Sequence, residues 1–259
     1  DNLLNESIVD GAVLNTWIDL SGNDNHATQY SDSNSILPTY DSDGINGYSS
    51  IVFDGIDDYM TVVEDMDNDS DSFSLFMVMK INPDSIEDGL LGKVNGDDDF
   101  HSISFNDSNQ IEFRYGDVVA SSTETFSDED VIILAYRVDA GTLSININGE
   151  QLTMSATSFS NSMGSGNSNW LLGAGYDSSS ITDYFQGSMG EILYFSDSLS
   201  TMEFSLIQYY LSQKWDLGAS VDSDGDSVFD DSDAFPLDVQ LSIVPTADSS
   251  IDSPPFSDS

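Results

Sequence analysis

A run of aspartates near the C-terminal end has a spacing that could bind a metal ion. Between Asp222 and Asp233, carboxylates occupy the first, third, fifth, ninth and twelfth positions, and Val228 at the seventh can offer only its backbone carbonyl. A calcium ion takes roughly six to eight oxygen ligands, and this spacing can supply most of them. The sequence therefore predicts a calcium site with the ligands Asp222, Asp224, Asp226, Val228, Asp230 and Asp233.

Two turns nearer the N-terminal end carry polar oxygens that could line the rim of a binding site. The first lies within residues 17–29, and the second follows the apolar segment Ile51–Phe53. Asp and Asn are also frequent in turns without any ligand, because their side chains accept hydrogen bonds from nearby backbone amides. A purely structural role is therefore the alternative for each candidate ligand-binding residue: Asp19, Asn23, Asp24, Asn25, Asp57 and Asp58.

Residue types that usually perform catalysis are scarce. The absence of cysteine excludes thiol catalysis and cysteine zinc sites. A glycosidase needs two carboxylates about 5–10 Å apart, and no strand-like segment carries alternating acids that would provide them. We expect Glu191 to accept a structural hydrogen bond, and the two histidines, His26 and His101, to be structural as well. The sequence therefore predicts a protein that is not an enzyme.

The charge balance restricts the partners of the chain. Its 259 residues include 47 acidic and 5 basic side chains, giving a net charge of −42. Phosphate backbones and anionic lipid surfaces would repel such a chain, so we expect no nucleic-acid partner. No apolar run reaches about 18 residues, so we expect no membrane insertion. Salt and bound divalent cations would weaken the repulsion among the chain's own acidic side chains, which favours an extracellular, calcium-containing setting.

The elements that must position these residues are short strands. Apolar segments such as Phe73–Ile81, Ile111–Tyr115 and Val131–Val138 recur between clusters of Gly, Asn, Asp and Ser. This pattern predicts an all-β, two-sheet antiparallel sandwich of the jelly-roll type. Phe73–Met79 is apolar on both faces apart from Ser74, which is typical of a central strand covered on both sides.

Two local signals predict a hairpin and a single amphipathic helix. Asn148-Gly149 fits a type I′ turn, which would place Ile145 opposite Leu152 and Leu143 opposite Met154. The segment Ser200-Thr-Met-Glu203 is a capping box, and apolar residues follow it at helical spacing as far as Trp215. We expect this helix to dock on the sandwich and to stop at Gly218.

The composition changes after the predicted helix and divides the chain into three parts. We expect a sandwich domain over residues 1–217, a calcium-loop extension over 218–238, and a tail or linker rich in Ser, Pro and Asp over 239–259.

Motifs at both ends of the large domain resemble a known family. They include Trp17-Ile-Asp-Leu-Ser-Gly-Asn-Asp-Asn-His-Ala-Thr-Gln29, Gly47-Tyr-Ser-Ser-Ile-Val-Phe-Asp-Gly55 and the closing Tyr210-Leu-Ser-Gln-Lys-Trp215. In this order they are similar to the LamG-like domains of the concanavalin A-like lectin/glucanase superfamily, over roughly residues 8–217. The segment from Asp222 to Asp238 resembles the calcium-binding thrombospondin type 3 repeat, although Ser227 replaces the usual Gly and Asp233 the usual Glu of a calcium loop.

The resemblance implies a calcium-binding adhesion module that binds a glycan or a surface protein. Within a larger secreted or cell-surface protein, such a module would not be catalytic. An alternative is a structural subunit of a calcium-stabilised extracellular filament, layer or sheath, which would self-assemble through the tail 239–259 or the N-terminal arm 1–12. A glycan hydrolase or lyase is a weaker alternative.

Overall fold

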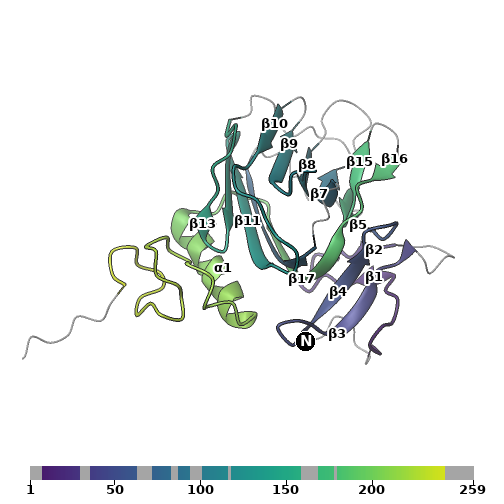
Figure 1. The fold of residues 1–259 in the computed structure, drawn as a ribbon, viewed down its shortest axis with the longest axis horizontal. Helices are drawn as coiled ribbons and strands as arrows, with labels where there is room; N and C mark the ends of the chain where they lie inside the picture. Colours follow the sequence, from purple (N-terminus) through teal and green to yellow (C-terminus); the bar gives the residue numbers. More distant parts are fainter. Residues whose placement is uncertain are drawn as a thin grey trace, which may run out of the picture.

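The computed structural model describes residues 8–29, 36–62, 72–82, 87–93, 101–115, 118–158, 169–177 and 180–242. Two antiparallel sheets face each other, and one helix packs outside them (Figure 1). This arrangement confirms the predicted all-β sandwich with a C-terminal helix. No helix in these ranges is long and apolar enough to cross a membrane.

The first sheet has eight strands. In spatial order they are β1 (Thr16–Trp17), β2 (Ala27–Thr28), β5 (Met60–Val62), β14 (Trp170–Leu172), β7 (Asp88–Lys93), β8 (His101–Phe105), β9 (Ile111–Tyr115) and β10 (Val118–Ser121). A separate two-stranded hairpin, β15 (Gly175–Asp177) and β16 (Ser180–Thr182), approaches β7.

The second sheet has seven strands. Their order is β13 (Glu150–Gln151), β12 (Thr142–Ile147), β11 (Val131–Asp139), β6 (Phe73–Ile81), β17 (Gln186–Phe195), β4 (Tyr48–Asp54) and β3 (Thr39–Ile45). Strand β6 therefore lies at the centre, paired with β11 on one side and β17 on the other.

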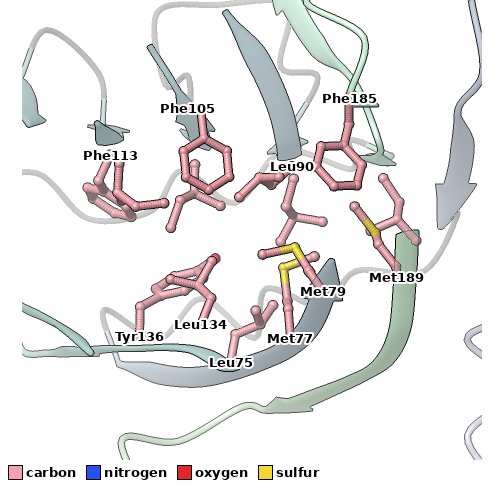
Figure 2. Packing of buried hydrophobic residues seen from close by; sticks show 14 of the residues in the cluster. Leu75, Met77, Met79, Leu90, Phe105, Phe113, Leu134, Tyr136, Phe185 and Met189 are labelled. Atoms are coloured by element: carbon pink, nitrogen blue, oxygen red, sulfur yellow. The ribbon is translucent and has the colours of Figure 1, made fainter. Parts of the chain in front are cut away.

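The main core fills the space between the two sheets. Figure 2 shows Phe105 and Phe113 of the eight-stranded sheet directed toward Tyr136 and Leu75 of the seven-stranded sheet. These four side chains are fully buried. His101 also lies here, with its ring centroid 5.0 Å from that of Trp170. Both side chains are buried, in agreement with the structural role expected for His101.

A second core lies on the outer face of the seven-stranded sheet. Phe76 and Val78 alternate with residues of the main core along β6, and they pack against the helix α1 (Thr201–Lys214). Phe76 and Phe204 have ring centroids 4.8 Å apart. Because β6 is covered on both faces, its apolar residues do not alternate with polar ones, as the sequence indicated.

The helix α1 begins as predicted but ends differently. Ser200 and Glu203 form the capping box, with Ser200 N donating to the Glu203 carboxylate over 2.9 Å. The helix ends at Lys214, and Asp216 takes the left-handed backbone conformation, with φ of 52°. The prediction that Gly218 stops the helix is therefore wrong. A Cβ on Gly218 would lie 2.1 Å from Oδ1 of the exposed Asp231 side chain, which would have to move.

The hairpin after β12 is confirmed only close to its turn. Asn148 and Gly149 have φ of 52° and 88°, and the Leu152 amide donates to the carbonyl of Ile145 over 2.8 Å. Leu143 does not face Met154, because Met154 forms a bridge with Ser122 instead. The Leu143 amide donates to the carbonyl of Thr157. The chain leaves the hairpin after β13 and reaches the other sheet, which local turn chemistry does not encode.

Candidate functional site

The predicted calcium loop follows α1 and brings three carboxylates together. Each of Asp222, Asp224 and Asp226 contributes a carboxylate oxygen, and these atoms lie within 4.8 Å of one another. The loop bends because aspartate side chains accept hydrogen bonds from backbone amides further along it. Asp222 Oδ1 accepts from Gly225 N over 2.8 Å, and its Oδ2 accepts from Ser227 N over 2.7 Å. Local hydrogen bonding therefore forms the turn that makes the carboxylates converge.

Two carboxylate oxygens in this loop are buried without a donor. Asp224 Oδ2 and Asp233 Oδ2 accept no hydrogen bond from any described residue. Burial and the negative charges of Asp226, Asp222 and Asp233 raise the pKa of Asp224 to about 6. Buried anionic oxygens are unfavourable unless a cation or a donor faces them. These carboxylate oxygens are hard donors of the kind that calcium prefers, so the residues fit that ion.

The other two predicted ligands lie differently. The Val228 amide donates to Asp226 Oδ1 over 2.8 Å, so Val228 takes part in the turn through its backbone. The carboxylate of Asp230 lies outside the group of three convergent carboxylates and accepts hydrogen bonds from Ser223 and Ser212. Burial raises the pKa of Asp230, although these hydrogen bonds oppose the shift. Metal ligation by either residue stays a prediction.

The opening turn, residues 19–26, is organised around Asp19. Its carboxylate accepts hydrogen bonds from Ser21 N over 2.8 Å and from Asn25 N over 3.0 Å. Burial would raise the pKa of Asp19, but the hydrogen bonds from Ser21 and Asn25 outweigh it and lower that pKa. The Asp19 amide donates to His26 Nδ1 over 3.1 Å, which confirms a structural role for His26. Asn23 is exposed, and Asp24 takes a positive φ of 62°.

The second acidic turn contains a residue that the sequence analysis missed. Asp54, Asp57 and Asp58 each place a carboxylate oxygen within 4.8 Å of the other two. Asp58 is only 4% exposed, and its Oδ2 accepts from Asp54 N over 3.0 Å. Burial and the charges of Asp54 and Asp57 raise the pKa of Asp58 to about 6. The sequence carried a signal for this group, because only one tight turn at Gly55 separates Asp54 from Asp57 and Asp58.

The structure does not bring the two N-terminal turns together. Strand β2 pairs antiparallel with β5, so that Ala27 faces Val62 and Thr28 faces Thr61. The 19–26 turn precedes β2, whereas Asp57 and Asp58 precede β5. The two turns therefore lie at opposite ends of this strand pair, and no acid of the first turn belongs to the described group of Asp54, Asp57 and Asp58.

Glu191 has the structural role that we expected. Its carboxylate accepts a hydrogen bond from Trp215 Nε1 over 2.8 Å, and Lys214 Nζ lies 2.9 Å from Oε1. These contacts tie the end of α1 to β17. Gly190 is needed beside Glu191, because a Cβ there would lie 2.3 Å from the Trp215 ring.

The sheets, the helix and the acid-lined turns define a lectin-like β-sandwich. Residues 53–204 match the family described as the concanavalin A-like lectin/glucanases superfamily. The chain belongs to this superfamily. The match confirms the resemblance over residues 53–204, whereas the likeness to a thrombospondin type 3 repeat stays a prediction. A search among curated protein sequences found no match.

Solved structures with the same fold occur in glycan-active enzymes. A Trypanosoma rangeli sialidase in complex with the inhibitor DANA has 13% identity and a TM-score of 0.51, with 80% of this chain and 32% of that chain covered. Domain 4 of AbnA, a GH43 extracellular arabinanase from Geobacillus stearothermophilus, in complex with arabinotriose, has 18% identity and a TM-score of 0.50. That match covers 63% of this chain and 77% of the arabinanase domain.

A third match is the NanB sialidase from Streptococcus pneumoniae, with 17% identity and a TM-score of 0.47. The match covers 60% of this chain and 26% of the sialidase. The match therefore spans about a third or less of either sialidase chain. At these identities the likeness shows the fold alone.

Proposed function

We propose that this chain is a calcium-binding, non-catalytic module of an extracellular protein, and that it binds a glycan or a surface protein. The observation that carries the calcium part is the loop from Asp222 to Asp233. Three carboxylates converge there, and the buried oxygens Asp224 Oδ2 and Asp233 Oδ2 receive no hydrogen bond from the described residues. A calcium ion would neutralise this charge and complete the coordination that these oxygens lack.

Family membership and fold support the glycan part. The chain belongs to a superfamily of lectins and glucanases, and a domain of the same fold was solved with arabinotriose. The described residues also place the strand acid Glu191 in a structural contact with Trp215 and Lys214. A binding module therefore accounts for the site better than a hydrolase does. Because the two N-terminal turns lie apart, each is a separate candidate rim.

The experiment that tests calcium binding is isothermal titration calorimetry on the full chain. We expect binding in the range of about 10⁻⁴–10⁻³ M, as in other extracellular calcium modules. Asp226→Asn should weaken the affinity at least about tenfold because it removes one charged ligand. Asp231→Asn is the matched control, since it removes the same charge from an exposed neighbour in the loop. Equal affinities for the wild type and Asp226→Asn would overturn the site.

Glycan binding requires a separate test. A glycan array probed with and without a chelator should show calcium-dependent binding to a class of sugars. If no sugar or surface protein is bound in calcium, the recognition part of the proposal fails while the calcium part can stand. The assembly alternative depends on the N-terminal arm 1–12 and the tail 239–259, of which residues 1–7 and 243–259 lie outside the described residues. Light scattering on addition of calcium tests it, because ordered polymers would favour a structural subunit.

A further inference from the structure

The acidic loop is attached to the sandwich where it begins. The Asp222 amide donates to the carbonyl of Asn148 over 3.0 Å, at the turn between β12 and β13. Asn148 Oδ1 in turn accepts from the amide of Ile133 on β11 over 2.7 Å. The approach is close, because a Cβ on Gly149 would lie 1.6 Å from the Asp222 carbonyl oxygen. One metal-site residue is therefore held directly by the seven-stranded sheet.

The same loop is attached to α1 through Asp230. This carboxylate is 4% exposed, and its Oδ2 accepts hydrogen bonds from the hydroxyls of Ser212 on α1 and Ser223 in the loop. Its Oδ1 accepts from Ser223 N over 2.9 Å. The Asp230 amide donates to the carbonyl of Val221, which is fully buried in the second core. Asp230 Oδ2 thus joins the loop to the helix, and Oδ1 holds a contact within the loop.

The two attachments enclose the residues that would bind the metal. Asp224 and Asp226 lie between Asp222, which the sheet holds, and Asp230, which the helix holds. Drawing the carboxylates around a cation would fix the segment between these two points. Conversely, without the cation the carboxylates would repel one another, and this repulsion would strain both attachments.

We propose that Asp230 and Ser212 are positioning residues that link metal binding in the loop to the docking of α1 on the seven-stranded sheet. This inference rests on the proposed function, since it requires that the loop binds calcium. Linkage is reciprocal: if bound calcium strengthens the docking of α1 by some factor, docked α1 strengthens calcium binding by the same factor. The role differs from direct ligation, which would require an Asp230 oxygen to face the convergent carboxylates.

Hydrogen–deuterium exchange of the full chain, with and without saturating calcium, tests the link. In the wild type, calcium should slow amide exchange at least about fivefold in the loop, in α1 and in the turn at Asn148. Ser212→Ala should keep the slowing in the loop but lose most of it in α1. Ser205→Ala is the matched control, because Ser205 lies on the same helix and is only partly buried.

Calorimetry on the same variants separates the possible outcomes. Ser212→Ala should weaken calcium binding about fivefold, and Ser205→Ala should not. If calcium binds but exchange in α1 stays unchanged, or if Ser212→Ala behaves like the wild type, the inference is wrong and the calcium site survives. If no calcium binds, both fail. Should Ser212→Ala not fold, Asp230→Asn replaces it: calcium binding without slowed exchange in α1 supports positioning, and abolished binding shows direct ligation.

Discussion

Aspartate side chains have two different environments in this protein. Asp19 accepts several backbone and hydroxyl hydrogen bonds, which lower its pKa against the opposing effect of burial. Asp58 and Asp224 face other carboxylates and are partly or fully withdrawn from water, so the pKa of each is raised to about 6. The residue type alone therefore does not decide the charge state. The number of donors and the neighbouring charges decide it.

The raised pKa of Asp58 predicts that ionisation of its carboxyl lowers the stability of the folded protein. Its ordinary pKa is 3.8 and its pKa in the folded protein is about 6, so the folded state favours the protonated form. The stability that the protonated Asp58 contributes is fully present below about pH 3.8 and is lost as the pH rises through 6. In EDTA, Asp58→Asn should therefore stabilise the protein at pH 8 by about 2 kcal/mol and have little effect at pH 4.

Urea denaturation at the two pH values measures the effect of Asp58→Asn. Asp43→Asn is the control, since it makes the same charge change at an exposed position. A stabilisation of equal size at pH 4 and pH 8, or destabilisation at pH 8, would contradict the assignment of a strained charge to Asp58.

At the scale of elements, α1 connects the sandwich to the acidic loop. One face of α1 covers Phe76 and Val78 of β6, its end is tied to β17 through Glu191, and Ser212 contacts the loop. Figure 1 shows α1 outside the seven-stranded sheet, with the C-terminal segment beyond it. The loop itself buries little apolar area beyond Val221, so its internal order depends on polar contacts and on any bound cation.

This dependence predicts local loosening when one ligand is removed. Asp226→Ala should make residues 222–238 several times more sensitive to protease in calcium, because one carboxylate and its hydrogen bond to the Val228 amide are lost. The sandwich should stay folded, since its core lies between the sheets. Limited proteolysis with mass spectrometry, alongside near-ultraviolet circular dichroism, checks both statements. If Asp226→Ala unfolds the entire protein, the predicted division at residue 217 is wrong.

The whole molecule carries a net charge of −42, with only five basic side chains to oppose it. In the described part of the chain, three of the five pair with acids: Lys80 with Glu129, Arg114 with Glu112, and Lys214 with Glu191. Most of the negative charge must therefore be balanced by ions from solution. Screening by salt acts on all of this charge, whereas calcium at a specific site acts on a few carboxylates at short range.

The thermal stability should separate these two effects. Sodium chloride should raise the melting temperature gradually as the Debye length shortens. Calcium chloride at the same ionic strength should raise it further in the wild type, because binding to the folded state alone adds stability. That additional rise should disappear in the Asp226→Ala variant. Differential scanning calorimetry measures both, and identical melting temperatures in the two salts would contradict a specific calcium site.

The sequence by itself determined the features that depend on neighbouring residues. The capping box at Ser200 and the turn at Asn148-Gly149 are confirmed, because each depends on residues a few positions apart. Asp222, Asp224 and Asp226 lie together for the same reason, while their binding of calcium stays a prediction. The unbroken apolar pattern of Phe73–Met79 also identified the central strand, since a strand covered on both faces needs no polar side.

Only the tertiary structure decided the features that join distant segments. The contact of Asp230 with Ser212 spans 18 residues, and the bridge of Met154 to Ser122 replaced the predicted partner Leu143. The close approach of Gly149 to the Asp222 backbone likewise joins two distant segments. The physical reason is that short-range hydrogen bonding and periodicity are encoded locally, whereas the burial of a polar group depends on which other element packs against it.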